Sequence, residues 1–136
     1  MAGSREFVQR AKEVRRRIGG GMRQAGVIAA PGIVALETMV DRLIEDHRMA
    51  RRLAEGIAGI PGLAVELDAV ETNMVNVDHR GTRLGTDEVL ARLSTAGVIA
   101  SGRPPHHIRL VTNRHHDARI IDEALTRIRS LLAGAA

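Results

Sequence analysis

Arg15-Arg16-Arg17-Ile18-Gly19-Gly20-Gly21-Met22-Arg23-Gln24 is the stretch around which the chain is organised. A basic amphipathic run ends within it, and a new apolar run starts at Ala25. Three successive glycines lose much conformational entropy on folding, so we expect a positive φ or a close backbone approach here. Their spacing lacks the pattern of a P-loop or of a dinucleotide-binding fingerprint. By itself, the stretch therefore predicts a structural junction and not a phosphate site.

Helices are predicted on both sides of the glycines. Upstream, apolar residues recur at three- and four-residue spacings over 4–18, with Ser4 as the expected N-cap. Downstream, helical spacing continues over 25–59, until the sequence Gly59-Ile60-Pro61-Gly62 makes a turn. Pro31 costs a hydrogen bond unless a new turn begins there, so 25–59 is either two helices or one long helix with a bend.

After Gly62 the period of the apolar residues changes from helical spacing to alternation. Alternation and short apolar runs predict strands, and Thr86 followed by two acids predicts the start of a helix that Gly97 ends. The expected strands are 63–67, 73–77, 98–100 and 107–111, the expected loops 79–82 and 101–105, and the last helix 116–132. This order predicts an α+β domain in which helices cover one face of a small, mostly antiparallel sheet.

Composition limits the core and the chemistry. Hydrophobic residues make up 44% of the 136 residues, but the only aromatic is one Phe, so the core is expected to be aliphatic. With no cysteine, disulfides, thiolate catalysis and cysteine-built zinc sites are excluded. No apolar run approaches the ~18 residues that span a bilayer, and the N-terminus lacks a secretory pattern. We therefore expect no membrane partner and a cytoplasmic location.

The net charge of +4 and the pI near 11.1 resemble those of a nucleic-acid-binding protein. However, Lys12 is the only lysine, and the arginines are interleaved with acids, as in Glu45-Asp46-His47-Arg48. Arginine in place of lysine raises the pI without requiring a basic face, so no nucleic-acid partner is expected. An arginine-rich nucleic-acid binder stays open as an alternative, and binding that weakens steeply with salt would support it.

Two motifs carry a resemblance to a known family. Gly19-Gly20-Gly21-Met22-Arg23-Gln24 and Ile108-Arg109-Leu110-Val111-Thr112 resemble landmarks of the low-specificity L-threonine aldolases, in the expected order. That family consists of pyridoxal-phosphate enzymes of fold type I. The resemblance covers nearly the whole chain but only the C-terminal part of the family. It implies that 1–24 is the tail of a large cofactor-binding domain, and that 25–136 holds connecting helices and the C-terminal small domain.

The resemblance also assigns site residues. Arg109 would hold the α-carboxylate of the substrate, because a planar guanidinium makes two parallel hydrogen bonds to a carboxylate. Arg23 would help to bind that carboxylate, and Arg16 with Gly19, Gly20 and Gly21 would border the active site. From the residues alone, strand alternation points Arg109 to the face opposite Ile108 and Leu110, and composition favours a solvated surface residue there. Arg23 could likewise be an exposed residue at a helix start.

The chain departs from the family pattern at two places. Arg16 and Arg17 stand where lysine and methionine are common, and arginine does not titrate near neutrality, which puts a proton-transfer role there in doubt. Asn113 stands where the family commonly has histidine. The pairs His106-His107 and His115-His116 are not expected to bind metal, because adjacent residues on a strand point to opposite faces. His47 and His79 are expected to be solvated.

A pyridoxal-phosphate aldolase needs a lysine for its internal Schiff base, and Lys12 lies among arginines in a predicted helix. We therefore expect no catalytic residue and no bound cofactor in this chain alone. The implied whole enzyme cleaves the 3-hydroxy amino acids L-threonine and L-allo-threonine to glycine and acetaldehyde by a retro-aldol reaction, as a homo-oligomer. The alternative is a non-catalytic oligomerisation or regulatory module derived from that fold.

Overall fold

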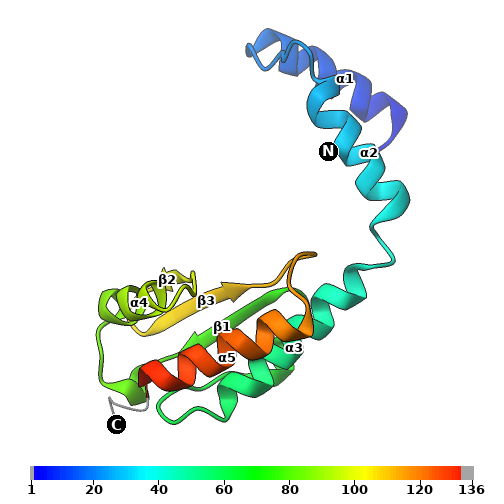
Figure 1. Ribbon diagram of the computed structural model, residues 1–136. Coiled ribbons are helices and arrows are strands. Elements are labelled where there is room, and N and C mark those ends of the chain that lie inside the picture. The colour runs from blue at the N-terminus through cyan, green and yellow to red at the C-terminus, as the bar shows by residue number, and fades with distance from the viewer. Residues whose placement is uncertain (1, 133–136) are drawn as a thin grey trace. The chain divides into compact units, whose positions relative to one another are not determined.

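The computed structural model describes residues 2–132, with the side chain of residue 132 excepted. The chain divides into two compact units, Met1–Val40 and Asp41–Ala136, and each is described by itself (Figure 1). The helices are α1 (Arg5–Arg17), α2 (Gly26–Thr38), α3 (Leu43–Ala58), α4 (Thr86–Thr95) and α5 (Ala118–Leu132), and the strands are β1 (Met74–Asp78), β2 (Ser101–Arg103) and β3 (His107–Val111). Two 3-10 turns, Leu67–Ala69 and Arg80–Thr82, complete the described part.

The first unit confirms the helix predicted over 4–18. The Ser4 hydroxyl accepts a hydrogen bond from the Phe7 amide at 3.2 Å and caps α1. At the other end, Gly19 has φ +76°, and its amide donates to the Arg16 carbonyl, while the Gly20 amide donates to the Arg15 carbonyl. This pair of bonds is a Schellman motif, in which the left-handed position favours glycine. The glycines thus end α1 as the sequence predicts.

Residues 25–59 form two helices, the first of the two alternatives. The break lies at Met39–Arg42, between α2 and α3, and not at Pro31, which α2 accommodates in its interior. None of the described residues of the first unit is buried within it. Both of its helices consequently present apolar side chains, including Phe7 on α1 and Leu36 on α2.

The second unit holds the core. Its sheet has the order β1-β3-β2 with both pairs antiparallel, in the register Asn76↔Arg109 and Ser101↔Arg109. Figure 1 shows α3 and α5 side by side along the sheet, and α4 packs beside β2. Buried aliphatic residues of these helices and of one sheet face form one cluster that includes Leu53, Ile57, Val75, Val89, Ile108 and Ile128. The predicted α+β architecture and aliphatic core are confirmed.

The strand predicted over 63–67 is wrong. Ala64 makes one isolated bridge to Asp78, and no ladder follows. Gly62 has φ +87°, and a Cβ on Gly81 would lie 2.7 Å from the Gly62 Cα, so the two backbones meet here. Leu63, Val65 and Leu67 alternate because they pack one side of an irregular segment against the core.

The strand predicted over 98–100 and the loop predicted over 101–105 are also misplaced. The strand that pairs is β2, Ser101–Arg103, while Ile99 is 90% exposed. A Cβ on Gly102 would lie 3.2 Å from the Leu90 side chain of α4. A glycine at this position therefore lets the helix approach the strand closely. Strands 73–77 and 107–111 are confirmed to within one residue by β1 and β3.

Candidate functional site

The open face of the sheet carries polar residues in rows that cross the three strands. Along β3, Ile108 and Leu110 are buried in the core, and Arg109 is partly buried on the opposite face, as alternation predicts. The antiparallel register places Asn76 of β1 and Ser101 of β2 directly beside Arg109. The next row brings together Asp78, His107 and Arg103. The fold thus centres Arg109 on a sheet face that the helices leave uncovered.

Arg109 has no carboxylate partner within residues 2–132. One of its terminal nitrogens lies 3.7 Å from the sulfur of Met74, which is a weak acceptor. Its Nε is buried and lacks a hydrogen-bond acceptor in the described structure. A buried donor without an acceptor is costly, and a guanidinium matches the geometry of a carboxylate. The arrangement is therefore suited to binding an anion.

Asp78 does not supply that anion. Hydrogen bonds from the Arg80 side chain and amide lower the pKa of the Asp78 carboxyl to about 2, so it is ionised at neutral pH. His107 is a more distant neighbour, with its Nε2 4.0 Å from the carboxylate. Because Arg80 already pairs with Asp78, this carboxylate is not the partner of Arg109.

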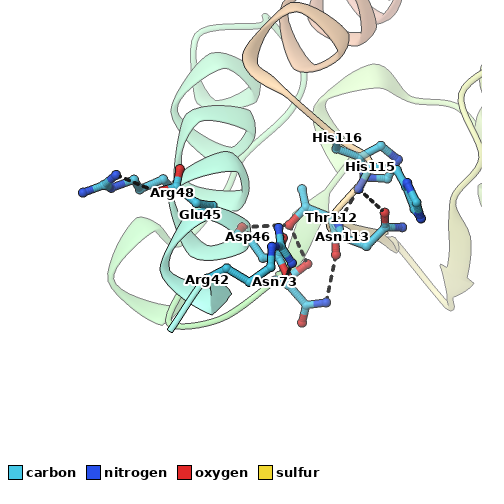
Figure 2. A network of polar contacts seen from close by, with 9 residues as sticks. All are labelled: Arg42, Glu45, Asp46, Arg48, Asn73, Thr112, Asn113, His115 and His116. Atoms are coloured by element: carbon cyan, nitrogen blue, oxygen red, sulfur yellow. Dashed lines mark hydrogen bonds and ion pairs between the residues drawn. The ribbon is translucent and has the colours of Figure 1, made fainter. Parts of the chain in front are cut away.

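A polar network fixes the far end of β3 (Figure 2). Thr112 follows the strand and is buried, and its hydroxyl donates to the backbone carbonyl of Asp46 at 3.0 Å. The Thr112 amide donates to the Asn73 carbonyl, and the Asn73 side-chain amide donates to the Thr112 carbonyl, both at 2.9 Å. Arg42 donates two hydrogen bonds to the largely buried Asp46 carboxylate. These contacts anchor the strand of Arg109 to the start of α3.

The turn after this strand holds the residue that departs from the family pattern. The Asn113 side-chain oxygen accepts from the His115 amide at 3.0 Å, and the Asn113 amide donates to Nδ1 of His116 at 3.1 Å (Figure 2). Since Nδ1 accepts a hydrogen bond, the proton of a neutral His116 lies on Nε2. Asn113 therefore shapes the turn after β3 and holds the ring of His116 in place.

A pocket of about 480 Å³ lies beside Arg109 within the second unit. Its walls are residues 97–101 and 109–112, and α5 closes it together with Leu53 of α3. It exists because β2 pairs with β3 only over Ser101–Arg103, so the chain preceding β2 departs from the end of β3. Sequence reasoning missed the pocket, since it expected pairing over 98–100.

His79 was expected to be solvated, and this is wrong, because its side chain is fully buried. The Thr86 hydroxyl donates to the Pro105 carbonyl at 2.9 Å, so it accepts from Nε2 of His79 at 3.1 Å. Nδ1 is then a buried acceptor, and it has no donor in the described part of the chain. Burial lowers the pKa of His79, which favours the neutral ring.

The other predicted site residues belong to the first unit. Arg16 lies on the last turn of α1, and Arg23 lies in the turn before α2, next to Gln24 at φ +48°. Both arginines are exposed. The helix end accounts for Gly19 and Gly20, whereas a Cβ on Gly21 would meet no atom within 4 Å. Convergence of these residues on Arg109 stays a prediction.

Lys12 does not fit the lysine of a pyridoxal-phosphate site. It is exposed on α1, along a shallow apolar groove formed by side chains such as Phe7 and Val14. All of this lining comes from α1 and the residue that follows it, so no second element encloses a cofactor. Among residues 2–132 there is also no group of three side chains that could hold a metal ion.

A family model described as beta-eliminating lyase matches residues 1–80. The chain is 38% identical over 123 residues to low-specificity L-threonine aldolase 1 of Arabidopsis thaliana, which covers 90% of this chain and 34% of that protein. It is 33% identical over 136 residues to the low specificity L-threonine aldolase of Escherichia coli strain K12, which covers 98% of this chain and 38% of that protein. The chain thus spans about a third of the length of these curated relatives.

Two solved structures share the fold. A NifS-like protein aligns with a TM-score of 0.64 at 16% identity, over 74% of this chain and 31% of that chain. The aspartate aminotransferase of Rhizobium meliloti aligns with a TM-score of 0.60 at 20% identity, over 77% of this chain and 30% of that chain. Both are fold type I enzymes, which confirms the predicted fold class. Within residues 2–132 no helix is both long and apolar enough to cross a membrane.

Proposed function

Because the chain belongs to the beta-eliminating lyase family, we propose that it forms the carboxylate-binding side of an L-threonine aldolase-like active site. The complete enzyme cleaves L-threonine or L-allo-threonine to glycine and acetaldehyde. Similarity to the low-specificity L-threonine aldolases of Arabidopsis thaliana and Escherichia coli supports this substrate class.

The environment of Arg109 carries the proposal. It lies in the motif that resembles the family, on the open face of the sheet, with a buried Nε that lacks an acceptor. In the proposed site its guanidinium donates two parallel hydrogen bonds to the substrate carboxylate, which fixes the direction of the scissile Cα–Cβ bond. Arg23 adds a second positive charge, and Arg16 with Gly19, Gly20 and Gly21 borders the same site.

The cofactor belongs to the part of the family that this chain does not match. Pyridoxal phosphate supplies an electron sink when bound, and it needs a lysine that the position of Lys12 does not provide. Residues 1–24 then form the tail of the large domain, and 25–136 the connecting helices and the small domain. The isolated chain is inactive, and the complete enzyme is a cytoplasmic homo-oligomer.

Borohydride reduction in the presence of pyridoxal phosphate tests this division of roles. The chain offers only Lys12 and its N-terminus as amines, so intact and peptide masses identify the labelled group. The proposal predicts slow, unselective labelling and no glycine release from threonine. Stoichiometric labelling of Lys12 together with turnover would show that the chain carries the chemistry itself, and the proposal would fail.

The second candidate is a non-catalytic oligomerisation module, and the apolar surface of the first unit favours it. Val27, Ile28 and Leu36 of α2 are each more than 60% exposed within the described structure. Exposed apolar patches of this kind are typical of interaction surfaces. Sedimentation velocity and a threonine-cleavage assay together separate the two candidates. The module would be supported if the chain forms a stable homo-oligomer but restores no threonine cleavage when it is mixed with the cofactor-binding domain of the proposed enzyme.

A further inference from the structure

The guanidinium of Arg109 is directed toward β1. Arg109 and Asn76 are register partners on the open face of the sheet, and Met74 stands two residues before Asn76 on β1. Such a diagonal neighbour lies within reach of a long side chain. One terminal nitrogen of Arg109 lies 3.7 Å from the Met74 sulfur, where the thioether acts as a weak hydrogen-bond acceptor. This contact sets the direction in which the guanidinium leaves β3.

The backbone that carries Met74 is fixed to the end of β3. Asn73 directly precedes Met74, and it exchanges two hydrogen bonds of 2.9 Å with Thr112 (Figure 2). Thr112 in turn donates to the backbone carbonyl of Asp46. The start of β1 cannot move relative to β3 without breaking these bonds. Met74 therefore extends toward Arg109 from an anchored position, although its side chain is 45% exposed.

The acceptor that Met74 offers is neutral. No carboxylate pairs with Arg109 in the described part of the chain, and its buried Nε has no acceptor. A carboxylate at position 74 would form a charge-assisted pair with the guanidinium and would compete with an incoming carboxylate. A thioether carries no charge and accepts only weakly. It can orient the guanidinium and still leave its positive charge available.

We propose that Met74 is a positioning residue for Arg109, whose thioether holds the guanidinium over β1 without neutralising it. The inference rests on the proposed function, in which Arg109 binds the substrate carboxylate, and Met74 acts only through Arg109. Its consequence is that position 74 requires a neutral acceptor. Leucine keeps the apolar bulk but removes the acceptor, glutamine supplies a neutral acceptor, and glutamate supplies a charged one.

The order parameter of the Arg109 Nε–H bond, measured by 15N NMR relaxation on the full chain, tests the positioning itself. Arg109→Gln assigns the signal by removing it. We expect an order parameter above about 0.6 in the unaltered chain and below it in Met74→Leu, with Met74→Gln and Met74→Glu retaining the higher value. Val111→Ala is the matched control. Val111 is the register partner of Met74, is also 45% exposed and offers no acceptor, so no change is expected.

Threonine cleavage tests the consequence for binding. It is measured in a chimera in which this chain replaces the matching segment of the Escherichia coli low specificity L-threonine aldolase. Loss of one weak hydrogen bond in Met74→Leu is expected to lower kcat/KM about threefold or more, chiefly through KM. Met74→Gln and Val111→Ala are expected to stay within about twofold. Met74→Glu is expected to lower kcat/KM about tenfold or more, although the guanidinium stays ordered.

The contrary results separate this inference from the proposed function. An unchanged order parameter in Met74→Leu would show that Met74 does not hold Arg109. If Met74→Gln loses as much as Met74→Leu, the acceptor is not the reason, and full kcat/KM in Met74→Glu would contradict the need for neutrality. The proposed function stands in these cases as long as Arg109→Gln lowers kcat/KM. If Arg109→Gln keeps full kcat/KM, the proposed function itself fails, whatever the order parameters show.

Discussion

Replacing the Thr112 hydroxyl by a methyl group is expected to destabilise the second unit measurably. Thr112 is 1% exposed, and its hydroxyl donates to the backbone carbonyl of Asp46 at 3.0 Å. This bond joins the end of β3 to α3, two elements that are distant in the sequence. Thr112→Val keeps the shape, so no cavity term arises, but it leaves a buried acceptor without this donor. A lost buried hydrogen bond of this kind costs about 1–3 kcal/mol. We expect about 1–2 kcal/mol, because valine recovers some apolar burial.

Urea denaturation followed by far-UV circular dichroism measures this loss, since the chain has no Trp or Tyr for fluorescence. With a typical m value for a small domain, the midpoint falls by roughly 1 M without a change in m. Thr126→Val is the matched control, because its hydroxyl bonds the Asp122 carbonyl on the exposed face of α5. The control is expected to stay within about 0.5 kcal/mol. Equal effects of the two variants would refute the claim that Thr112 anchors β3 to α3.

The remaining predictions concern other parts of the second unit. The folded-state pKa of His79 is lowered, so its contribution to stability is complete above the unfolded pKa of about 6.5 and is lost as the pH falls below it. Urea midpoints across this window are expected to fall less for His79→Gln than for the unaltered chain, and an identical pH dependence would contradict the assignment. Gly81→Ala places a Cβ 2.7 Å from the Gly62 backbone and is expected to cost about 1–3 kcal/mol in the same assay. Gly59→Ala, whose Cβ meets only ordinary contacts, is the control, and a Gly81→Ala variant as stable as this control would refute the close approach.

The sequence predicts those features that depend on local periodicity. Arg109 lies on the open face because Ile108 and Leu110 alternate with it, and this alternation is visible in the printed sequence. The glycines after α1 end a helix because a left-handed residue satisfies its last carbonyls, which is again a local rule. The face on which Arg109 lies and the end of α1 can therefore be predicted from the sequence.

Features that depend on contacts between distant segments could not be predicted. Val98-Ile99-Ala100 has strand propensity, but pairing with β3 is decided by the hairpin register and by the approach of Leu90 to Gly102. His79 stands between charged neighbours in the sequence, yet Thr86 and the segment near Pro105 enclose it. The pocket beside Arg109 could not be predicted for the same reason. It lies where a β2 extended over residues 98–100 would pair with β3.

The carboxylate-binding role of Arg109 is tested most directly in a chimera. In it, this chain replaces the matching segment of the Escherichia coli low specificity L-threonine aldolase, which supplies the rest of the fold. The chimera is predicted to release glycine from threonine. Arg109→Gln is predicted to lower kcat/KM about 100-fold or more through loss of two charge-assisted hydrogen bonds, and Arg103→Gln to change it only a few-fold. A folded, cofactor-loaded chimera that keeps full kcat/KM with Arg109→Gln would contradict the account.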